Sequence, residues 1–181
     1  LAPGEVRHYV TYYGLGGITL APGRLALGIT APAEVGLSSD GTAPFLAVAY
    51  VHNTGEGPAH DLVARLDLPS GFKLAGGQSN THSIGDLEPG QTAQVAWQVV
   101  ATWASVGRAD LAVSVSAKNA DANAVSREIQ VLGPPRLLAS IRRVEALQVR
   151  DERLYPWPAR VSVRVENTGG SDANWVKVRL D

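Results

Sequence analysis

Hydrophobic and polar residues alternate with a period of two along much of this chain. In residues 62–68 every second residue is leucine or alanine, and Arg65 and Asp67 lie between them. Residues 109–117 and 159–166 alternate in the same way. Successive side chains of a strand point to opposite faces of a sheet, so each segment predicts a strand with one buried face.

Other segments are rich in β-branched and aromatic residues and lie between turn signals, which also predicts strands. Residues 45–52 are apolar at nearly every position, as is typical of a centrally buried strand. Residues 136–150 fit a helix about as well as a strand, and the all-β surroundings favour a strand. The remaining predicted strands are residues 6–13, 25–30, 72–74, 81–84, 92–102 and 125–132. Roughly seven strands between residues 45 and 132 predict a β-sandwich.

Turn residues separate these strands. Asparagine and glycine tolerate a positive φ, and an asparagine side chain can bond the backbone two residues further on. Proline fixes φ and withholds a donor, so it ends a strand. The turn residues predicted in the central part of the chain are Asn53, Gly55, Pro69, Gly71, Pro89 and Gly90.

Two of these turns occur twice. Asn53-Thr54-Gly55 returns 114 positions later as Asn167-Thr168-Gly169, and Arg65-Leu66-Asp67 returns at the same offset as Arg179-Leu180-Asp181. Asn167 and Gly169 are therefore predicted to form the same turn. The motif Leu-x-Pro-Gly occurs at residue 1 and again at residue 87. Repetition at these distances predicts tandem structural units.

The predicted fold class is all-β, with immunoglobulin-like antiparallel β-sandwich repeats in tandem. We expect residues 1–40 to be C-terminal strands of a preceding sandwich and residues 41–132 to be a complete sandwich. Residues 133–158 are expected to be a Pro- and Arg-rich connector, and residues 159–181 the N-terminal strands of a following sandwich. The first junction, residues 31–44, is so short that either one strand serves both sandwiches or the two abut, which predicts a stiff rod.

The order of motifs supports this organisation. Asn53-Thr54-Gly55 is followed by Asp67-Leu68-Pro69-x-Gly71, then by Leu87-x-Pro89-Gly90, and then by Gly107. This order resembles the bacterial and archaeal surface repeats of immunoglobulin-like fold, which include a conserved-repeat domain of unknown function and its CARDB and NEW3 relatives. The resemblance covers residues 43–132. It implies an extracellular or cell-envelope location and a spacer or adhesive role, and it brings no catalytic residues.

Composition limits the partners. Charged residues make up 18% of the 181-residue chain, against 19 glycines and 11 prolines, which suits short strands joined by turns. A net charge of −1 gives no long-range attraction to nucleic acid or to an anionic membrane. The absence of cysteine excludes disulfides. The sequence contains no run of about 18 apolar residues, which is the signal that would predict a membrane span. Methionine is also absent, so we expect a mature product, an excised segment or part of something longer.

The chain has four histidines, His8, His52, His60 and His82. His52 and His60 flank the Asn53 turn, and we expect that they could face each other across a hairpin. Asp61 is the only carboxylate near them, which is too few ligands for zinc, so polar loop residues are the favoured interpretation.

Residues 119–123 carry alternate oxygen ligands like part of a calcium loop, but they lack the glycine and the distal glutamate of an EF-hand, so a hairpin turn is favoured. Carboxylates are scattered, and no pair is placed for acid–base work. The sequence therefore predicts neither an enzyme nor a cofactor.

Aromatic residues have two interpretations. Trp97 and Phe45 lie on predicted strands and are expected in the core. Tyr155, Trp157 and Trp175 are candidate contacts for a glycan, although core and interdomain packing is the favoured role.

The leading hypothesis is a non-enzymatic structural repeat segment of an extracellular or cell-surface protein, such as a stalk, sheath or fibre. Its expected partners are neighbouring immunoglobulin-like domains, either of the same chain or of adjacent chains. Strand addition between chains would make a homopolymer. The alternative is a carbohydrate-binding or adhesive accessory module of a secreted protein, with a surface glycan as its partner.

Replacing Trp97 tests the predicted core. If Trp97 fills the space between two sheets, Trp97→Ala is expected to lower the free energy of unfolding by about 3–5 kcal/mol. Thermal unfolding measures this, and an unchanged midpoint would place Trp97 on the surface.

Overall fold

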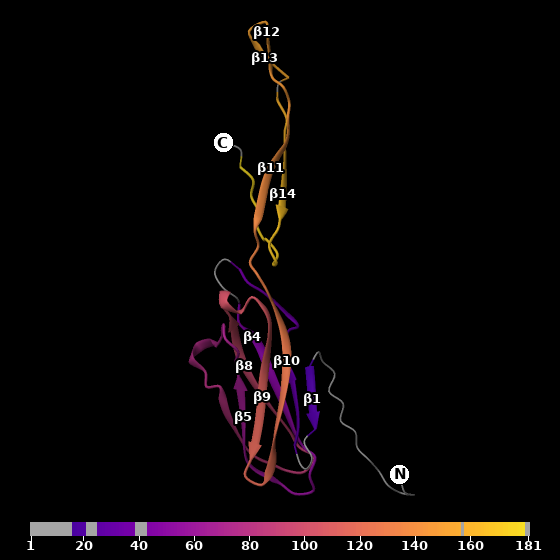
Figure 1. Cartoon of the computed structure of the whole chain (residues 1–181), viewed down its shortest axis with the longest axis vertical. Helices are drawn as coiled ribbons and strands as arrows, with labels where there is room; N and C mark the ends of the chain where they lie inside the picture. The colour runs from indigo at the N-terminus through magenta and orange to yellow at the C-terminus, as the bar shows by residue number, and fades with distance from the viewer. Residues whose placement is uncertain (1–15, 21–24, 39–42, 157, 180–181) are drawn as a thin grey trace, which may run out of the picture.

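A computed structural model of the chain describes residues 16–20, 25–38, 43–156 and 158–179. They form a β-sandwich, from which a narrower ribbon of two strands extends along the same long axis (Figure 1). The strand predicted at residues 6–13 lies outside the described residues. No helix in the described part of the chain is long and apolar enough to cross a membrane.

The first sheet of the sandwich has five strands, and all of its neighbouring strands are antiparallel. In spatial order they are β1 (Gly16–Leu20), β2 (Leu25–Thr30), β4 (Phe45–Asn53), β8 (Thr92–Ala101) and β6 (Phe72–Leu74).

The second sheet also has five strands. In spatial order they are β3 (Glu34–Gly36), β10 (Ala120–Leu132), β9 (Gly107–Ala117), β5 (Ala59–Asp67) and β7 (Thr81–Leu87). The pairing of β3 with β10 is parallel, and the other pairings are antiparallel. Two short 3-10 turns, η1 (Ala75–Gly77) and η2 (Trp103–Ser105), lie in the connections.

The core lies between the two sheets and takes every second residue of β4 and of β9, whereas β2 is buried at five consecutive residues. Leu62, Ala64 and Leu66 of β5 are all fully buried, and Trp97 is buried completely. Phe45 is half-buried and packs edge-on against Phe72. Burial of each large apolar side chain stabilises the fold by about 1.5–3 kcal/mol, so the alternation seen in the sequence accounts for most of the core.

Strand β4 is central in its sheet, between β2 and β8. Its side chains nevertheless alternate between the core and an open outer face. Ala47, Ala49 and Val51 are fully buried, whereas Leu46 is 53% exposed. The strand is therefore buried on one face and not on both.

The boundary predicted at residue 40 is wrong for residues 25–38. Strand β2 pairs with β4 along six residues, and Leu25, Leu27 and Ile29 are buried in the same core as Trp97. Strand β3 then crosses to the second sheet and pairs with β10. Strands β2 and β3 therefore belong to the central sandwich, because they pair with its strands β4 and β10, and the apolar side chains of β2 lie in its core.

The ribbon consists of β11 (Leu137–Val144) and β14 (Val161–Asn167), which are antiparallel. A small hairpin of β12 (Gln148–Arg150) and β13 (Arg153–Tyr155) lies at the far end (Figure 1). The ambiguous segment 136–150 is thus extended. The predicted connector 133–158 contains β11, whose partner is the strand predicted at 159–166.

Candidate functional site

Among the described residues, the most deeply buried polar side chain is that of Asn53, at the end of β4. Its side chain is fully buried. The amide nitrogen donates to the carbonyl of Gly57 at 2.9 Å and to that of Leu87 at 2.7 Å, and the amide oxygen accepts the Gly55 N–H at 2.9 Å. The backbone carbonyl of Asn53 also accepts the N–H of Gly90 at 2.9 Å. Two predicted turns therefore meet at Asn53 and join the sheets.

Asn167, at the end of β14, closes its turn in the same way. Its amide nitrogen donates to the carbonyl of Ser171 at 2.7 Å, and its amide oxygen accepts the Gly169 N–H at 3.0 Å. These bonds span four and two residues, as they do at Asn53. Asn167 is exposed, however, and its oxygen also accepts the N–H of Arg136 at 3.1 Å.

The repeated turn is joined to the end of the sandwich. Thr168 donates its backbone N–H to the carbonyl of Arg136 at 2.7 Å, and its hydroxyl donates to the same carbonyl at 3.1 Å. The Ser171 hydroxyl lies 2.7 Å from the carbonyl of Gly133 and 3.3 Å from that of Leu132, the last residue of β10. We call residues 132–136 and 167–171 the junction.

Glycines allow this close approach. A Cβ on Gly169 would lie 2.2 Å from the carbonyl oxygen of Pro134 and 2.4 Å from the nitrogen of Arg136, both backbone atoms. A Cβ on Gly170 would lie 3.0 Å from the nitrogen of Gly133. The two chain segments are thus in backbone contact, and no side chain fits at Gly169 without moving them apart.

The Pro69–Gly71 turn lies elsewhere in the sandwich. Gly71 has a φ of 85°, and a Cβ there would lie 2.6 Å from the nitrogen of Ser105. Its carbonyl accepts the N–H of Thr102 at 2.8 Å, and the carbonyl of Pro69 accepts the N–H of Phe72 at 3.3 Å. This turn packs on η2 and supports the fold.

The structure separates the histidines. His52 lies on β4 with Nδ1 2.9 Å from the Thr92 hydroxyl, and His60 lies on β5 with Nδ1 3.0 Å from a carboxylate oxygen of Asp86. The two strands belong to opposite sheets, so the prediction that these histidines could face each other across a hairpin is wrong. His82 packs edge-on against Trp97 with ring centroids 5.4 Å apart. His8 lies outside the described residues.

A polar cluster surrounds the irregular start of β5. The Asp86 carboxylate accepts the Asp61 N–H at 2.8 Å and faces His60. These two contacts, in that order, lower the pKa of Asp86. Lys118 pairs with Asp61 at 2.7 Å, which raises the pKa of the lysine. Asp61 has a φ of 50° at a register shift between β5 and β7, so the cluster stabilises a bulge.

Asn119 and Asn123 use their side-chain amides within the fold. The Asn119 oxygen accepts the His60 N–H at 2.9 Å, and its nitrogen donates to the carbonyl of Pro58 at 2.9 Å. The buried Asn123 donates to the carbonyl of Leu25 at 3.1 Å. Within the described ranges, no group of three or more histidine, aspartate or glutamate side chains is placed to hold a metal ion.

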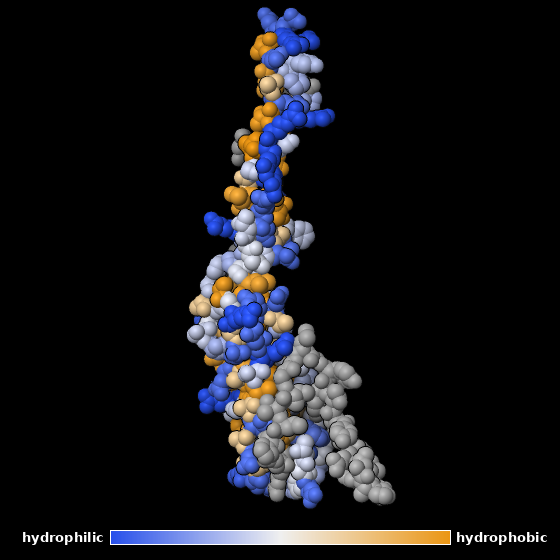
Figure 2. Space-filling view, turned by 45° about the vertical axis from the view of Figure 1, so that its right-hand side comes forward, coloured by the Kyte–Doolittle hydropathy of each residue, from blue (hydrophilic) through white to orange (hydrophobic). Residues whose placement is uncertain are grey.

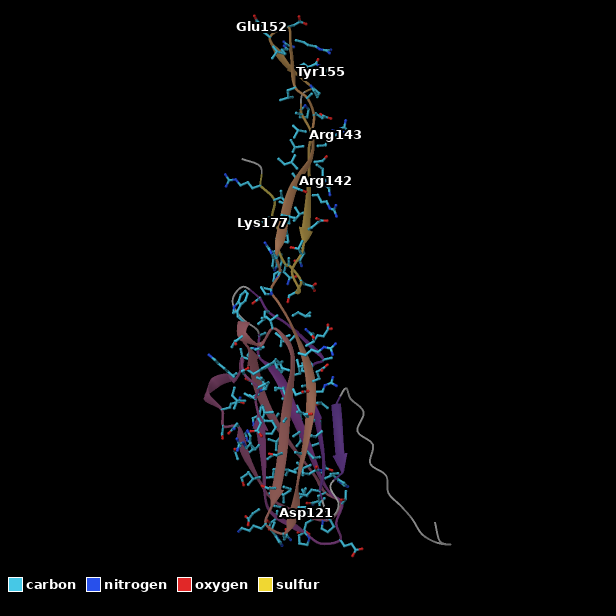
Figure 3. The ribbon with its side chains drawn as sticks, viewed as in Figure 1. Asp121, Arg142, Arg143, Glu152, Tyr155 and Lys177 are labelled. Atoms are coloured by element: carbon cyan, nitrogen blue, oxygen red, sulfur yellow. The ribbon has the colours of Figure 1, made fainter. Side chains whose placement is uncertain are left out.

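Two of the aromatic candidates, Tyr155 and Trp175, lie apart. Tyr155 is 58% exposed, and the Arg150 guanidinium lies 5.1 Å from the centre of its ring. Trp175 is 94% exposed. Figure 3 shows Tyr155 near the far tip, whereas Lys177, two residues after Trp175, lies beside the part of β11 nearer the sandwich. Tyr155 and Trp175 therefore share no platform, and Trp157 lies outside the described residues.

A hollow of about 500 Å³ opens beside the junction. Its lining includes Glu34 and Leu37 from one side, and Ser171, Asp172 and Asn174 from the other. Glu34 and Asp172 give this hollow two carboxylates, so it is a polar crevice between two parts of the chain.

Comparison with known protein families matches the central part of the sandwich. Residues 42–118, from β4 to β9, match the NPCBM-associated, NEW3 domain of alpha-galactosidase. The predicted resemblance to NEW3 domains is confirmed. A search of curated proteins finds no significant match. The matched segment holds strands β4 to β9 of the sandwich.

Solved structures support the fold. Two crystal structures of Salmonella alpha-2-macroglobulin, one of a mutant and one of the protein reacted with methylamine, match with a TM-score of 0.50. They are 16% and 18% identical and cover 70% and 68% of this chain, which spans 8% of each macroglobulin chain. The CARDB domain of a Pyrococcus furiosus protein, in complex with di-metal ions, is 15% identical, with a TM-score of 0.42, over 67% of this chain and 97% of that chain. The fold is an immunoglobulin-like β-sandwich.

The sequence indicated the repeated turn but not its second role. The Asn-Thr-Gly motif predicts a turn at Asn167, and the structure places one there. The additional signal was Gly169-Gly170-Ser171, which follows Gly133-Pro134-Pro135 by 36 positions (133 to 169). Neither segment alone shows that the two are in contact.

Removing the Asn53 amide tests its structural role. Asn53→Ala leaves the carbonyls of Gly57 and Leu87 and the N–H of Gly55 without this partner, so the free energy of unfolding is expected to fall by about 2–4 kcal/mol. Urea denaturation measures it. Asn167→Ala is the matched control, because it removes the same turn from an exposed position, and a change of less than about 1 kcal/mol is expected in the unfolding of the sandwich. Equal losses in the two variants would contradict the assignment.

The Asp86 contacts predict a pH dependence. Because the pKa of Asp86 is lowered in the folded state, its contribution to stability is present above the ordinary pKa of an aspartate and is lost as the pH falls through the lowered value. Asp86→Asn is expected to remove this part of the acid sensitivity, while Asp110→Asn on β9 leaves it in place. Denaturant titrations from pH 7 to strongly acidic pH compare them, and parallel curves for Asp86→Asn and the unaltered chain would refute the role.

Proposed function

We propose that this chain is a non-catalytic spacer segment of an extracellular or cell-surface protein, built from immunoglobulin-like modules in series. The observation that carries the proposal is the junction. There the repeated Asn167 turn is bonded to the last residues of β10 and lies against backbone at Gly169.

The junction supports stiffness for a physical reason. A flexible linker of n residues explores many orientations, and its ends are free of lasting contacts. Here the backbone between β10 and β11 is four residues long (133 to 136), and Gly133 and Arg136 both accept hydrogen bonds from the repeated turn. Bending at this point would break those bonds.

Two further findings support a non-catalytic role. The match to an NPCBM-associated NEW3 domain is to an accessory type of module. Within the described residues, the polar side chains of Asn53, Asp86 and Asn119 form hydrogen bonds that stabilise turns and a bulge. We further propose that the chain is secreted or lies at the cell surface, where it serves as a spacer in a stalk, sheath or fibre.

A second candidate function is contact with a surface glycan through Trp175. Its side chain is almost fully exposed at 94%, and its φ of 57° is close to the 50° of Asp61. An exposed indole can stack on a sugar ring. Glycan-array binding that is lost in Trp175→Ala and kept in Trp103→Ala, an exposed tryptophan of η2, would favour this function; binding unaffected by Trp175→Ala would remove it.

Spin labels across the junction test the spacer proposal. The chain has no cysteine, so Arg108→Cys on β9 and Arg142→Cys on β11 give a single labelled pair. Double electron–electron resonance is expected to give one narrow distance distribution. Adding Gly169→Ala is expected to broaden it while the sandwich keeps its thermal midpoint, because the added methyl group forces the backbones apart.

Gly57→Ala is the matched control, since a Cβ there meets nothing within 4 Å. It is expected to keep the narrow distribution. A broad distance distribution in the labelled chain that keeps Gly169 would refute the spacer proposal, because the sandwich and the ribbon would then move independently.

A further inference from the structure

One face of the ribbon is apolar and open. On β11 this face carries Leu137, Ile141 and Val144, which are 47%, 62% and 59% exposed. The register places Val161 opposite Val144 and Val163 opposite Ile141 on β14. Figure 2 shows hydrophobic residues exposed along the narrow part of the molecule, between hydrophilic ones. The other face carries an ion pair of Arg164 with Glu166. The ribbon is thus amphipathic, as one half of a sandwich is.

The central sandwich shows what covers an equivalent face. In β2 and β4, Leu25 lies opposite Asn53, and in β11 and β14, Leu137 lies opposite Asn167. The side chains of Leu25, Leu27 and Ile29 are at most 1% exposed. They share one core with residues of β5, β9 and β10, which form the opposing sheet.

The chain that leaves the Asn167 turn repeats the start of that opposing sheet. At an offset of 114, Asp61 corresponds to Trp175, and both have a positive φ, of 50° and 57°. Leu62 corresponds to Val176. Leu62 is fully buried, whereas Val176 is 44% exposed. Residues 173–178 therefore occupy the positions after the Asn167 turn that residues 59–64 of β5 occupy after the Asn53 turn, but Val176 and Val178 are exposed.

We propose that the apolar face of the ribbon is the inner surface of a second sandwich, and that its occupant is an opposing sheet like that of β5, β9 and β10, supplied by a further repeat of the same polypeptide. The central sandwich covers its own face with the strand that leaves its asparagine turn. Residues 173–178 leave the Asn167 turn in the same way, which favours the same polypeptide over a second copy. This inference rests on the proposed function, because it assumes modules in series.

A graft tests it. Arg-Leu-Asp occurs at residues 65–67 and again at 179–181, so a second copy of residues 68–132 can be appended after Asp181 in matching phase. If the ribbon is half of a sandwich, the amide hydrogens of β11 and β14 are expected to exchange on the order of 100-fold more slowly in the grafted chain. Val163→Asp, on the apolar face, is expected to abolish this protection. Ser162→Asp, one residue away on the other face, is expected to keep it.

Unchanged exchange of β11 and β14 in the grafted chain would overturn the proposal, since the ribbon is proposed to be sufficient to hold such a sheet. Concentration-dependent dimerisation of the 181-residue chain that Val163→Asp abolishes and Ser162→Asp keeps would overturn it too, and would identify a second copy as the occupant. A narrow spin-label distance distribution together with unchanged exchange would support the spacer function and refute the second sandwich. A broad distribution together with slowed exchange would refute the spacer function and support the second sandwich.

Discussion

The structure depends on one small interaction, the bonding of turn backbone by a buried asparagine amide. Asn53 satisfies the carbonyls of Gly57 and Leu87 and the N–H of Gly55 with a single side chain. A buried backbone group without a partner costs about 1–3 kcal/mol, so the amide stabilises a chain reversal that hydrophobic burial alone would leave unfavourable. Since Leu87 ends a strand of the opposite sheet, the same side chain also fixes how the two sheets meet.

The repeat uses this interaction twice, in two environments. Asn167 makes the same two bonds within its turn, but its third partner is the N–H of Arg136 next to the sandwich. A motif that closes a turn inside one unit thus also anchors the next structural element to it. The close contact at Gly169 follows from this, because the turn can reach Arg136 only where no Cβ intervenes.

Local pattern predicted much of the fold. The alternation of apolar and polar residues in 62–68 and 109–117 correctly predicted β5 and β9, because every second side chain of a strand points to its buried face. Pairings between distant segments were less accessible. Strand β3 pairs in parallel with β10, about 96 residues later (34 to 130), and nothing in residues 25–38 distinguishes the first strands of this sandwich from the last strands of another.

The same limit applies to the candidate sites. The sequence placed Asn53 and Asn167 in turns, since the hydrogen bonds involved span two and four residues. It misplaced His52 and His60 as neighbours, because the turn between them carries the chain from one sheet to the other. The contact of Gly169 with Pro134 joins segments that are 35 positions apart, and only the folded backbone shows it.

The most direct test of the account is whether the sandwich and the ribbon tumble as one body. Nitrogen-15 relaxation of the backbone amides in β4 and β14 reports their rotational diffusion separately. The account predicts one diffusion tensor, elongated along the common axis, that fits both strands. Separate tensors, with faster tumbling of β14, would show that the Asn167 turn does not hold the ribbon, and would contradict it.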